Sequence, residues 1–174
     1  MPNHVAVEVI FRNVDDEAQK RILSVACNPQ GEIDFSVLLP VPLNCWMGGV
    51  GTQHKIFPDN GLDWCTKNWG TKWGPYDLGP NSIIPTTDSL TFHFSTAWRP
   101  PYGWLVALYN KLSLPIEYNW LSEGEERGHS GRFDPSQKLD EWKEEPCDDE
   151  MQKHLHLQRW GCESFPEETE EAEL

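Results

Sequence analysis

The stretch "SLTFHFSTAWRPPYGWLVALYNKLSLPIEYNWL", residues 89–121, holds a strand, a helix and a second strand in succession. Over residues 89–98 apolar and polar side chains alternate, which is typical of a strand with one buried face. The expected buried face carries Leu90, Phe92, Phe94 and Thr96, and the face expected to be solvated or lightly covered carries Thr91, His93 and Ser95. "RPP" ends this strand, and residues 102–112 have apolar side chains at helical spacing. The segment therefore predicts a β-α-β unit.

The start of the chain predicts a second unit of the same kind. "HVAVEVIF" (residues 4–11) alternates as a strand, and "DDEAQKRILSVAC" (residues 15–27) has an acidic first turn and a helical apolar stripe. "IDFSVLLPVP" (residues 33–42) is expected to be the next strand, ended by its prolines. Two β-α-β units in one chain predict an α+β fold, the ferredoxin-like split βαβ. A short strand in "GHSGRF" (residues 128–133) would extend one edge.

The chain divides into four parts by composition. Residues 1–133 are expected to form the ferredoxin-like domain, interrupted at about 43–88 by a Gly-, Pro- and Trp-rich insertion that is too long for a plain connection. Residues 134–162 form an amphipathic acidic extension, and residues 163–174 an acidic tail expected to be disordered. We expect residues 1–133 to fold alone, with the extension docking loosely through Trp142 and Trp160.

The charge of the chain is unevenly distributed. Of the formal net charge of −14, residues 1–120 contribute −3 (8 basic and 11 acidic side chains) and residues 121–174 contribute −11 (6 basic and 17 acidic). A field of this sign repels phosphate backbones and disfavours nucleic-acid binding. No apolar stretch is long and unbroken enough to predict a membrane span. The five irregularly spaced cysteines, without a CxxC, favour free thiols in a reducing cytoplasm.

Three tryptophans lie in "WCTKNWGTKWGPYD", residues 64–77, inside the insertion. Asp63 is a suitable N-cap and Gly70 a suitable residue for positive φ after the last turn, so a short helix is expected between them. Its indoles could form a structural clasp against the sheet or a partner-binding surface, and a metal-free active site is the third alternative. The candidate residues are Trp64, Lys67, Asn68, Trp69, Gly70, Thr71, Lys72, Trp73 and Trp98.

Familiar catalytic motifs are absent from the sequence. It contains no GxSxG, HExxH, Walker loop or Gly-rich dinucleotide fingerprint, so the sequence favours a protein that is not an enzyme and predicts no cofactor. The best metal candidates are Cys147, His154, His156 and Cys162. Their spacing matches no usual zinc motif, and on a helix His154 and His156 point apart, so the two histidines are expected to be surface residues rather than ligands.

Several motifs together resemble a known family. "MPNHV", "NWGTKWGPYD", "FSTAWRPP", "IEYNW" and "GHSGRF" are similar to the Api92-like, or YubB, ferredoxin-like family of small phage- and plasmid-borne proteins. The resemblance covers residues 1–133 and leaves the acidic extension without family support. It implies the ferredoxin-like fold, carriage by a mobile element and the cytoplasm of a bacterial host, but no biochemical role.

Three functions from different classes remain. The favoured one is a noncatalytic mobile-element protein that binds a host or defence-system protein, with inhibition as one way of acting, through the Trp-rich insertion and the acidic extension. A nucleic-acid-binding module that uses the open sheet face is weakened by the acidic charge and by the absence of paired aromatics on residues 91, 93 and 95. An unrecognised hydrolase or transferase is the third. The identity of the partner and the oligomeric state are left open by the sequence.

Overall fold

The computed structural model describes residues 3–46, 59–136 and 142–163. Its main sheet has six strands in the order β4-β5-β1-β6-β7-β8, and every neighbouring pair is antiparallel. The strands are β1 (His4–Arg12), β4 (Ile83–Pro85), β5 (Ser89–Ala97), β6 (Ile116–Ser122), β7 (His129–Phe133) and β8 (Glu144–Pro146). A separate parallel pair joins β2 (Cys45–Trp46) to β3 (Asp59–Asn60).

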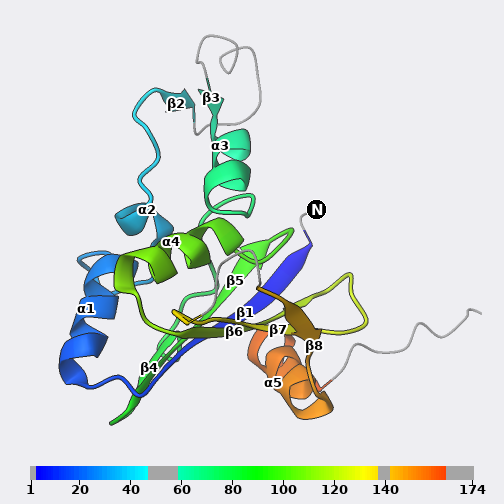
Figure 1. The fold of residues 1–174 in the computed structure, drawn as a ribbon. Helices are drawn as coiled ribbons and strands as arrows, with labels where there is room; N and C mark the ends of the chain where they lie inside the picture. Colours follow the sequence, from blue (N-terminus) through cyan, green and yellow to red (C-terminus); the bar gives the residue numbers. More distant parts are fainter. Residues whose placement is uncertain (1–2, 47–58, 137–141, 164–174) are drawn as a thin grey trace, which may run out of the picture.

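Helices lie on both sides of this sheet (Figure 1). One side carries α1 (Asp16–Ala26), α2 (Phe35–Leu38) and α4 (Tyr102–Leu112), with α3 (Gly61–Asn68) beyond them. The other side carries α5 (Asp149–Trp160). The large core lies on the first side, where the odd-numbered residues of β1 meet Ile22, Leu105 and Leu108. A smaller apolar cluster under α5 contains Ala6, Leu121, Cys147 and Leu155.

The four strands β6-β1-β5-β4 form the ferredoxin-like sheet. Because β5 is antiparallel to both β1 and β4, the latter two run parallel, and α1 lies in the connection between them. Helix α4 makes the second crossover, from β5 to β6. The α+β fold predicted from the periodicity is therefore confirmed, and the helix predicted over residues 102–112 has the bounds expected.

The second strand of the fold comes from residues that the sequence analysis placed elsewhere. The strand expected over residues 33–42 is wrong: Ile33 makes a single bridge to Cys27, and Phe35–Leu38 is helix α2. The carboxylate of Asp34 accepts a hydrogen bond from the Ser36 amide and so caps this helix. The parallel partner of β1 is instead β4, so the insertion interrupts the first β-α-β unit rather than following it.

The acidic extension belongs to the same sheet. Strand β8 pairs with β7, and the Glu144 carboxylate accepts hydrogen bonds from Tyr102, Tyr118 and Trp120 at 2.8 to 3.0 Å. The ring of Trp142 stacks on that of Phe133 with centroids 5.4 Å apart. Whether residues 1–133 fold alone stays a prediction, and these contacts argue against it. The acidic tail expected over residues 163–174 falls, apart from its first residue, outside the described residues.

Candidate functional site

A short helix forms in the Trp-rich stretch as expected, but it begins earlier. Helix α3 has Asn60 as its N-cap, and Asp63 is the third helical residue rather than the cap. The Asn60 side chain caps the helix, because its Oδ1 accepts from the Asp63 amide, and its Nδ2 also donates to Asp63 Oδ2. Gly70 has φ +89°, which confirms the positive φ expected after the last turn.

Two of the tryptophans belong to the structural core. Trp69 is 5% exposed, and its indole Nε1 donates to the carbonyl of Leu39 at 3.0 Å. The ring of Trp64 meets that of Trp69 edge to face, with centroids 5.4 Å apart. Trp69 also contacts Phe35, a ring at the centre of the core. These two indoles therefore join the insertion to the core, as the clasp interpretation of the stretch would require.

The other two tryptophans lie at the surface. Trp73 is 39% exposed and Trp98 is 41% exposed, and the Lys72 ammonium lies 4.8 Å and 4.5 Å from their respective ring centroids. Trp98 has φ +78°, a strained value for a bulky residue that is not glycine. We call these three residues the Trp73–Lys72–Trp98 surface. Tryptophan is among the residues that contribute most to binding at protein interfaces, so this surface is a candidate for contact with another protein.

Hydrogen bonds hold this surface against the end of β5. The hydroxyl of the buried Thr71 donates to the Ala97 carbonyl at 2.7 Å and accepts from the Ala97 amide at 3.2 Å. Farther along, Tyr76 forms an antiparallel bridge with Ser95. The surface is therefore presented on a fixed segment. Of the remaining candidates, Lys67 is exposed on α3 and Asn68 donates its side-chain amide to the Trp64 carbonyl.

A polar row crosses the sheet on the side that faces α5. Glu8 of β1 lies directly opposite His93 of β5 and Asn119 of β6, and Asn119 lies opposite Ser130 of β7. His93 Nε2 is 3.0 Å from Glu8 Oε1, and Asn119 Nδ2 donates to Glu8 Oε2 at 2.7 Å. The hydroxyl of Ser130 donates to Asn119 Oδ1 at 2.6 Å. The polar side chains of four strands thus form one connected network.

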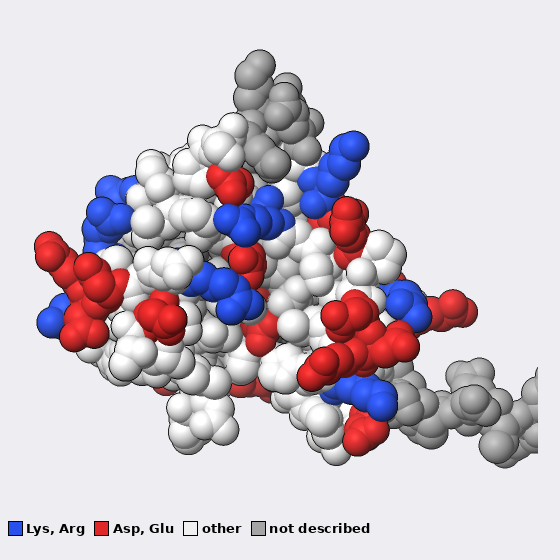
Figure 2. Space-filling model, turned by 60° about the horizontal axis from the view of Figure 1, so that its bottom comes forward, with Lys and Arg blue, Asp and Glu red and all other residues white. Residues whose placement is uncertain are grey.

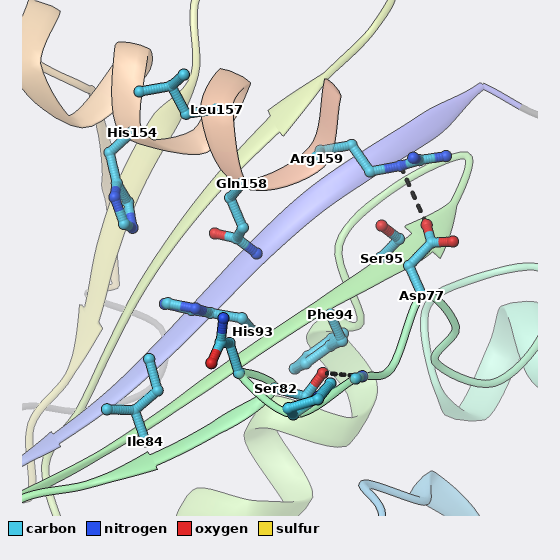
Figure 3. Close-up of a pocket in the computed structure, with 13 residues that line it drawn as sticks. Asp77, Ser82, Ile84, His93, Phe94, Ser95, His154, Leu157, Gln158 and Arg159 are labelled. Carbon is cyan, nitrogen blue, oxygen red and sulfur yellow. Dashed lines mark hydrogen bonds and ion pairs between the residues drawn. The ribbon is translucent and has the colours of Figure 1, made fainter. Parts of the chain in front are cut away.

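Helix α5 adds a second histidine to this network. His154 Nε2 lies 2.9 Å from Glu8 Oε1, so two imidazoles converge on one carboxylate oxygen. Figure 3 shows His154 reaching down from the helix toward His93 on the sheet. Burial alone would raise the pKa of Glu8, which is 5% exposed, but hydrogen bonds from His93 and Asn119 and the neighbouring imidazole charges outweigh it. The pKa therefore lies below its ordinary value, and the buried carboxylate is ionised.

A cavity of about 580 Å³ opens beside the two histidines (Figure 3). Polar residues from three segments line it, among them Ser82, Ser95, Gln158 and Arg159, together with His93 and His154. The guanidinium of Arg159 pairs with the Asp77 carboxylate at 3.1 Å. A partly enclosed space beside convergent titratable groups has the features of a small-ligand site.

The four metal candidates from the sequence, Cys147, His154, His156 and Cys162, do not form one metal-binding group in the structure. Of these four, His154 alone joins a group of three metal-ligating side chains among the residues that the structure describes, and that group is completed by Glu8 and His93. His156 was expected at the surface but is 3% exposed and packs beside Trp160. Cys147 is buried, with its Sγ 3.1 Å from the Ser130 hydroxyl, and Cys162 is partly exposed.

Sequence reasoning missed Glu8, Asn119 and Ser130 as site residues and treated His93 as part of a solvated face. The local signal was present, because Glu8 is a charged residue in the middle of an otherwise apolar strand. A charge at such a position needs a partner once it is buried. The sequence did not predict the strand register that places His93 and Asn119 opposite Glu8, nor that helix α5 covers these residues.

The charge distribution of the surface fits the sequence analysis. Figure 2 shows the Lys and Arg side chains of this face as separate groups, with acidic side chains between them and on both sides of the view. The visible described residues of this face thus form no continuous basic surface of the kind that nucleic-acid binding uses. None of the helices in the described residues is long and apolar enough to cross a membrane.

Comparison with known proteins bears on the fold. Neither a curated protein nor a solved structure matches the chain. A family model described as the ferredoxin-like domain in Api92-like protein matches residues 64–163. This match runs through the acidic extension, for which the sequence resemblance predicted no family support, and agrees with the place of β8 and α5 on the sheet. Since the match covers more than half of the 174 residues, the chain belongs to the Api92-like family and carries its ferredoxin-like domain.

Proposed function

We propose that this is a noncatalytic protein of a phage or plasmid that binds a host or defence-system protein in the cytoplasm of a bacterial cell. The observation that carries the proposal is the Trp73–Lys72–Trp98 surface, where two indoles about 40% exposed flank one lysine. The carriage by a mobile element rests on the family resemblance alone. Inhibition of the bound protein is the simplest way in which such a protein would act.

The energetics of the exposed indoles support binding. Aromatic residues of this size can bury roughly 150–250 Å² each, of which about 40% is still exposed at Trp73 and Trp98 and open to a partner, and Trp is among the residues that dominate interface energy. Trp98 has a strained φ of +78° and remains 41% exposed, with the Lys72 ammonium over its ring. Strain of this kind costs on the order of 1–3 kcal/mol and is concentrated at functional sites. A partner that covered both indoles would explain why the strained backbone conformation of Trp98 is retained.

Site-specific photocrosslinking in bacterial cells tests the proposal. A benzoylphenylalanine at position 73 or 98 should yield one discrete adduct with a cellular protein, since these positions would lie in the interface. The same group at Val37, which is 40% exposed on α2, is the matched control and should yield no such adduct. Excess unlabelled parent should suppress the adduct, whereas excess Trp73→Ala/Trp98→Ala variant should not. Adducts of equal yield at all three positions, or none at 73 and 98, would overturn the proposal.

The acidic extension would act at longer range. A negative field steers association with a basic surface, and added salt screens it, with a Debye length of about 8 Å at physiological ionic strength. Once the crosslinked partner is identified, its association rate with the intact chain should fall steeply as salt is added, while the dissociation rate changes less. An association rate that is indifferent to salt would remove the electrostatic part of the proposal and leave the aromatic part standing.

A further inference from the structure

We propose that Glu8, His93 and His154 bind a divalent transition-metal ion, with zinc as the reference ion. One ligand atom from each residue lies within 4.8 Å of the other two, and the Glu8 oxygen is 3.0 Å and 2.9 Å from the two imidazole nitrogens. Zinc binds imidazole nitrogen and carboxylate oxygen at roughly 2.0–2.2 Å in tetrahedral geometry, which separates ligand atoms by about 3.4 Å. Side-chain rotations would widen the two oxygen–nitrogen separations to that spacing when the ion binds.

The residues around the ligands hold the carboxylate in a binding orientation. Asn119 Nδ2 donates to Glu8 Oε2 at 2.7 Å, which leaves Oε1 for the ion. The Asn119 amide is oriented in turn, because its oxygen accepts from the Ser130 hydroxyl at 2.6 Å. Hydrogen-bonded outer residues that fix a ligating carboxylate are a regular property of metal sites.

The choice of ligands selects the kind of ion. Calcium and magnesium take oxygen ligands almost exclusively, whereas imidazole suits zinc, iron, nickel and copper. An ionised carboxylate with two imidazoles is the donor set of several catalytic zinc sites and of non-haem iron sites. A divalent ion would also neutralise the charge of Glu8, a carboxylate that is 5% exposed.

Three protein ligands leave at least one coordination position for water or a small ligand. His93 and His154 both line the cavity of about 580 Å³, so that position would face the cavity rather than the core. The ion would tie α5 to the paired strands β1 and β5 through His154, in addition to the side-chain contact that His154 already makes with Glu8. This site shares no residue with the Trp73–Lys72–Trp98 surface, and the two proposals stand or fall separately.

Titration of the full-length chain with Zn²⁺ and Co²⁺, after treatment with a chelator, tests the site. We expect one ion per chain, a higher melting temperature with Zn²⁺, and visible absorption from bound Co²⁺ without a thiolate-to-cobalt charge-transfer band. His93→Gln and His154→Gln should each weaken binding at least about tenfold, and Asn119→Ala should weaken it by about tenfold as an outer residue. His129→Gln, whose histidine pairs with Glu125 elsewhere on the surface, is the matched control and should bind as the parent does.

Each contrary outcome is informative. The side chain of His154 is 45% exposed, so His154→Gln should keep the fold even if Glu8→Gln does not. Binding of equal affinity in the parent and in His154→Gln would overturn the proposal, as would the absence of saturable one-to-one binding. A charge-transfer band from a thiolate would show that the ion binds at one of the five cysteines instead and would overturn the proposal as well.

Discussion

His154 Nε2 lies 2.9 Å from Glu8 Oε1, which joins the last helix of the described chain to its first strand. Glu8 is at the middle of β1, and β1 is bordered by β5 and β6. The polar side of the central strand is therefore covered by α5, with Leu155 fully buried beside the contact. A ferredoxin-like sheet whose second side would otherwise be open has become a three-layer structure.

Removal of the extension should destabilise the whole fold. Deleting residues 134–174 would expose Ala6 and Leu121, strand β7 would lose its partner β8, and Glu8 would lose His154. We expect the truncated chain to be largely unfolded or to melt at a much lower temperature, as measured by circular dichroism. Deleting only residues 164–174 removes none of these contacts and serves as the control. A truncation at residue 133 that melts like the parent would contradict the layer argument.

Substitution of a buried tryptophan in the Trp-rich stretch should cost more unfolding free energy than substitution of an exposed one. Trp69→Ala removes a buried ring and should cost about 3–5 kcal/mol of unfolding free energy. Trp73→Ala, at a position that is 39% exposed, should cost clearly less than Trp69→Ala, because less apolar surface returns to water and no closed cavity is left behind. Urea denaturation of the two variants measures the difference. Equal losses would show that the Trp73 ring contributes to the core after all.

The contact between α3 and α4 depends on Gly103. A β-carbon there would lie 2.1 Å from the Asn68 carbonyl oxygen and 2.8 Å from its carbon, a backbone overlap that no rotamer change relieves. Gly103→Ala should therefore displace α4 and destabilise the chain by several kcal/mol, or prevent folding. Gly79→Ala is the matched control, because a β-carbon at Gly79 meets no atom within 4 Å. Thermal melting of both variants decides, and a Gly103→Ala variant as stable as Gly79→Ala would contradict the predicted overlap.

Cys27 should be slow to alkylate. Burial raises the pKa of this thiol from 9.0 to about 11, and the thiolate is the reactive form. At pH 8 its thiolate fraction is then about 100-fold below that of a thiol at the ordinary value, and the rate should rise about tenfold for each pH unit up to about pH 11. Timed iodoacetamide labelling followed by peptide mass spectrometry measures this. A Cys27 rate equal to that of a free cysteine peptide, or one independent of pH, would contradict it.

Periodicity predicted most of the long elements, and it failed where the elements were short. Residues 102–112 carry three helical turns of apolar spacing, and their helix appeared as expected. Strand β4 has only three residues, which are too few to show alternation, so the sequence analysis assigned them to the insertion. The apolar run over residues 35–38 is compatible with a strand or a helix. The hydrogen bond from the Ser36 amide to the Asp34 side chain stabilises the first turn of a helix there.

The candidate site was less predictable than the fold for a related reason. Glu8 and His93 are 85 residues apart in the chain, and Glu8 and Asn119 are 111 apart. Each strand shows locally which residues share its polar face, but the register that sets them opposite one another depends on the complete sheet. Trp73 and Trp69 were likewise equivalent in the sequence, and only the packing of α3 on the core separates the buried ring from the exposed one.

The two outermost strands have a consequence for self-association. Both β4 and β8 are three residues long, and both end in a proline, Pro85 and Pro146, which has no amide hydrogen to offer a further strand. Short edges with proline and charge oppose edge-to-edge pairing and the fibril growth that begins from it. Strand addition is thereby disfavoured at either end of this six-stranded sheet, which favours recognition of a partner through side chains over recognition through shared backbone hydrogen bonds at these two edges.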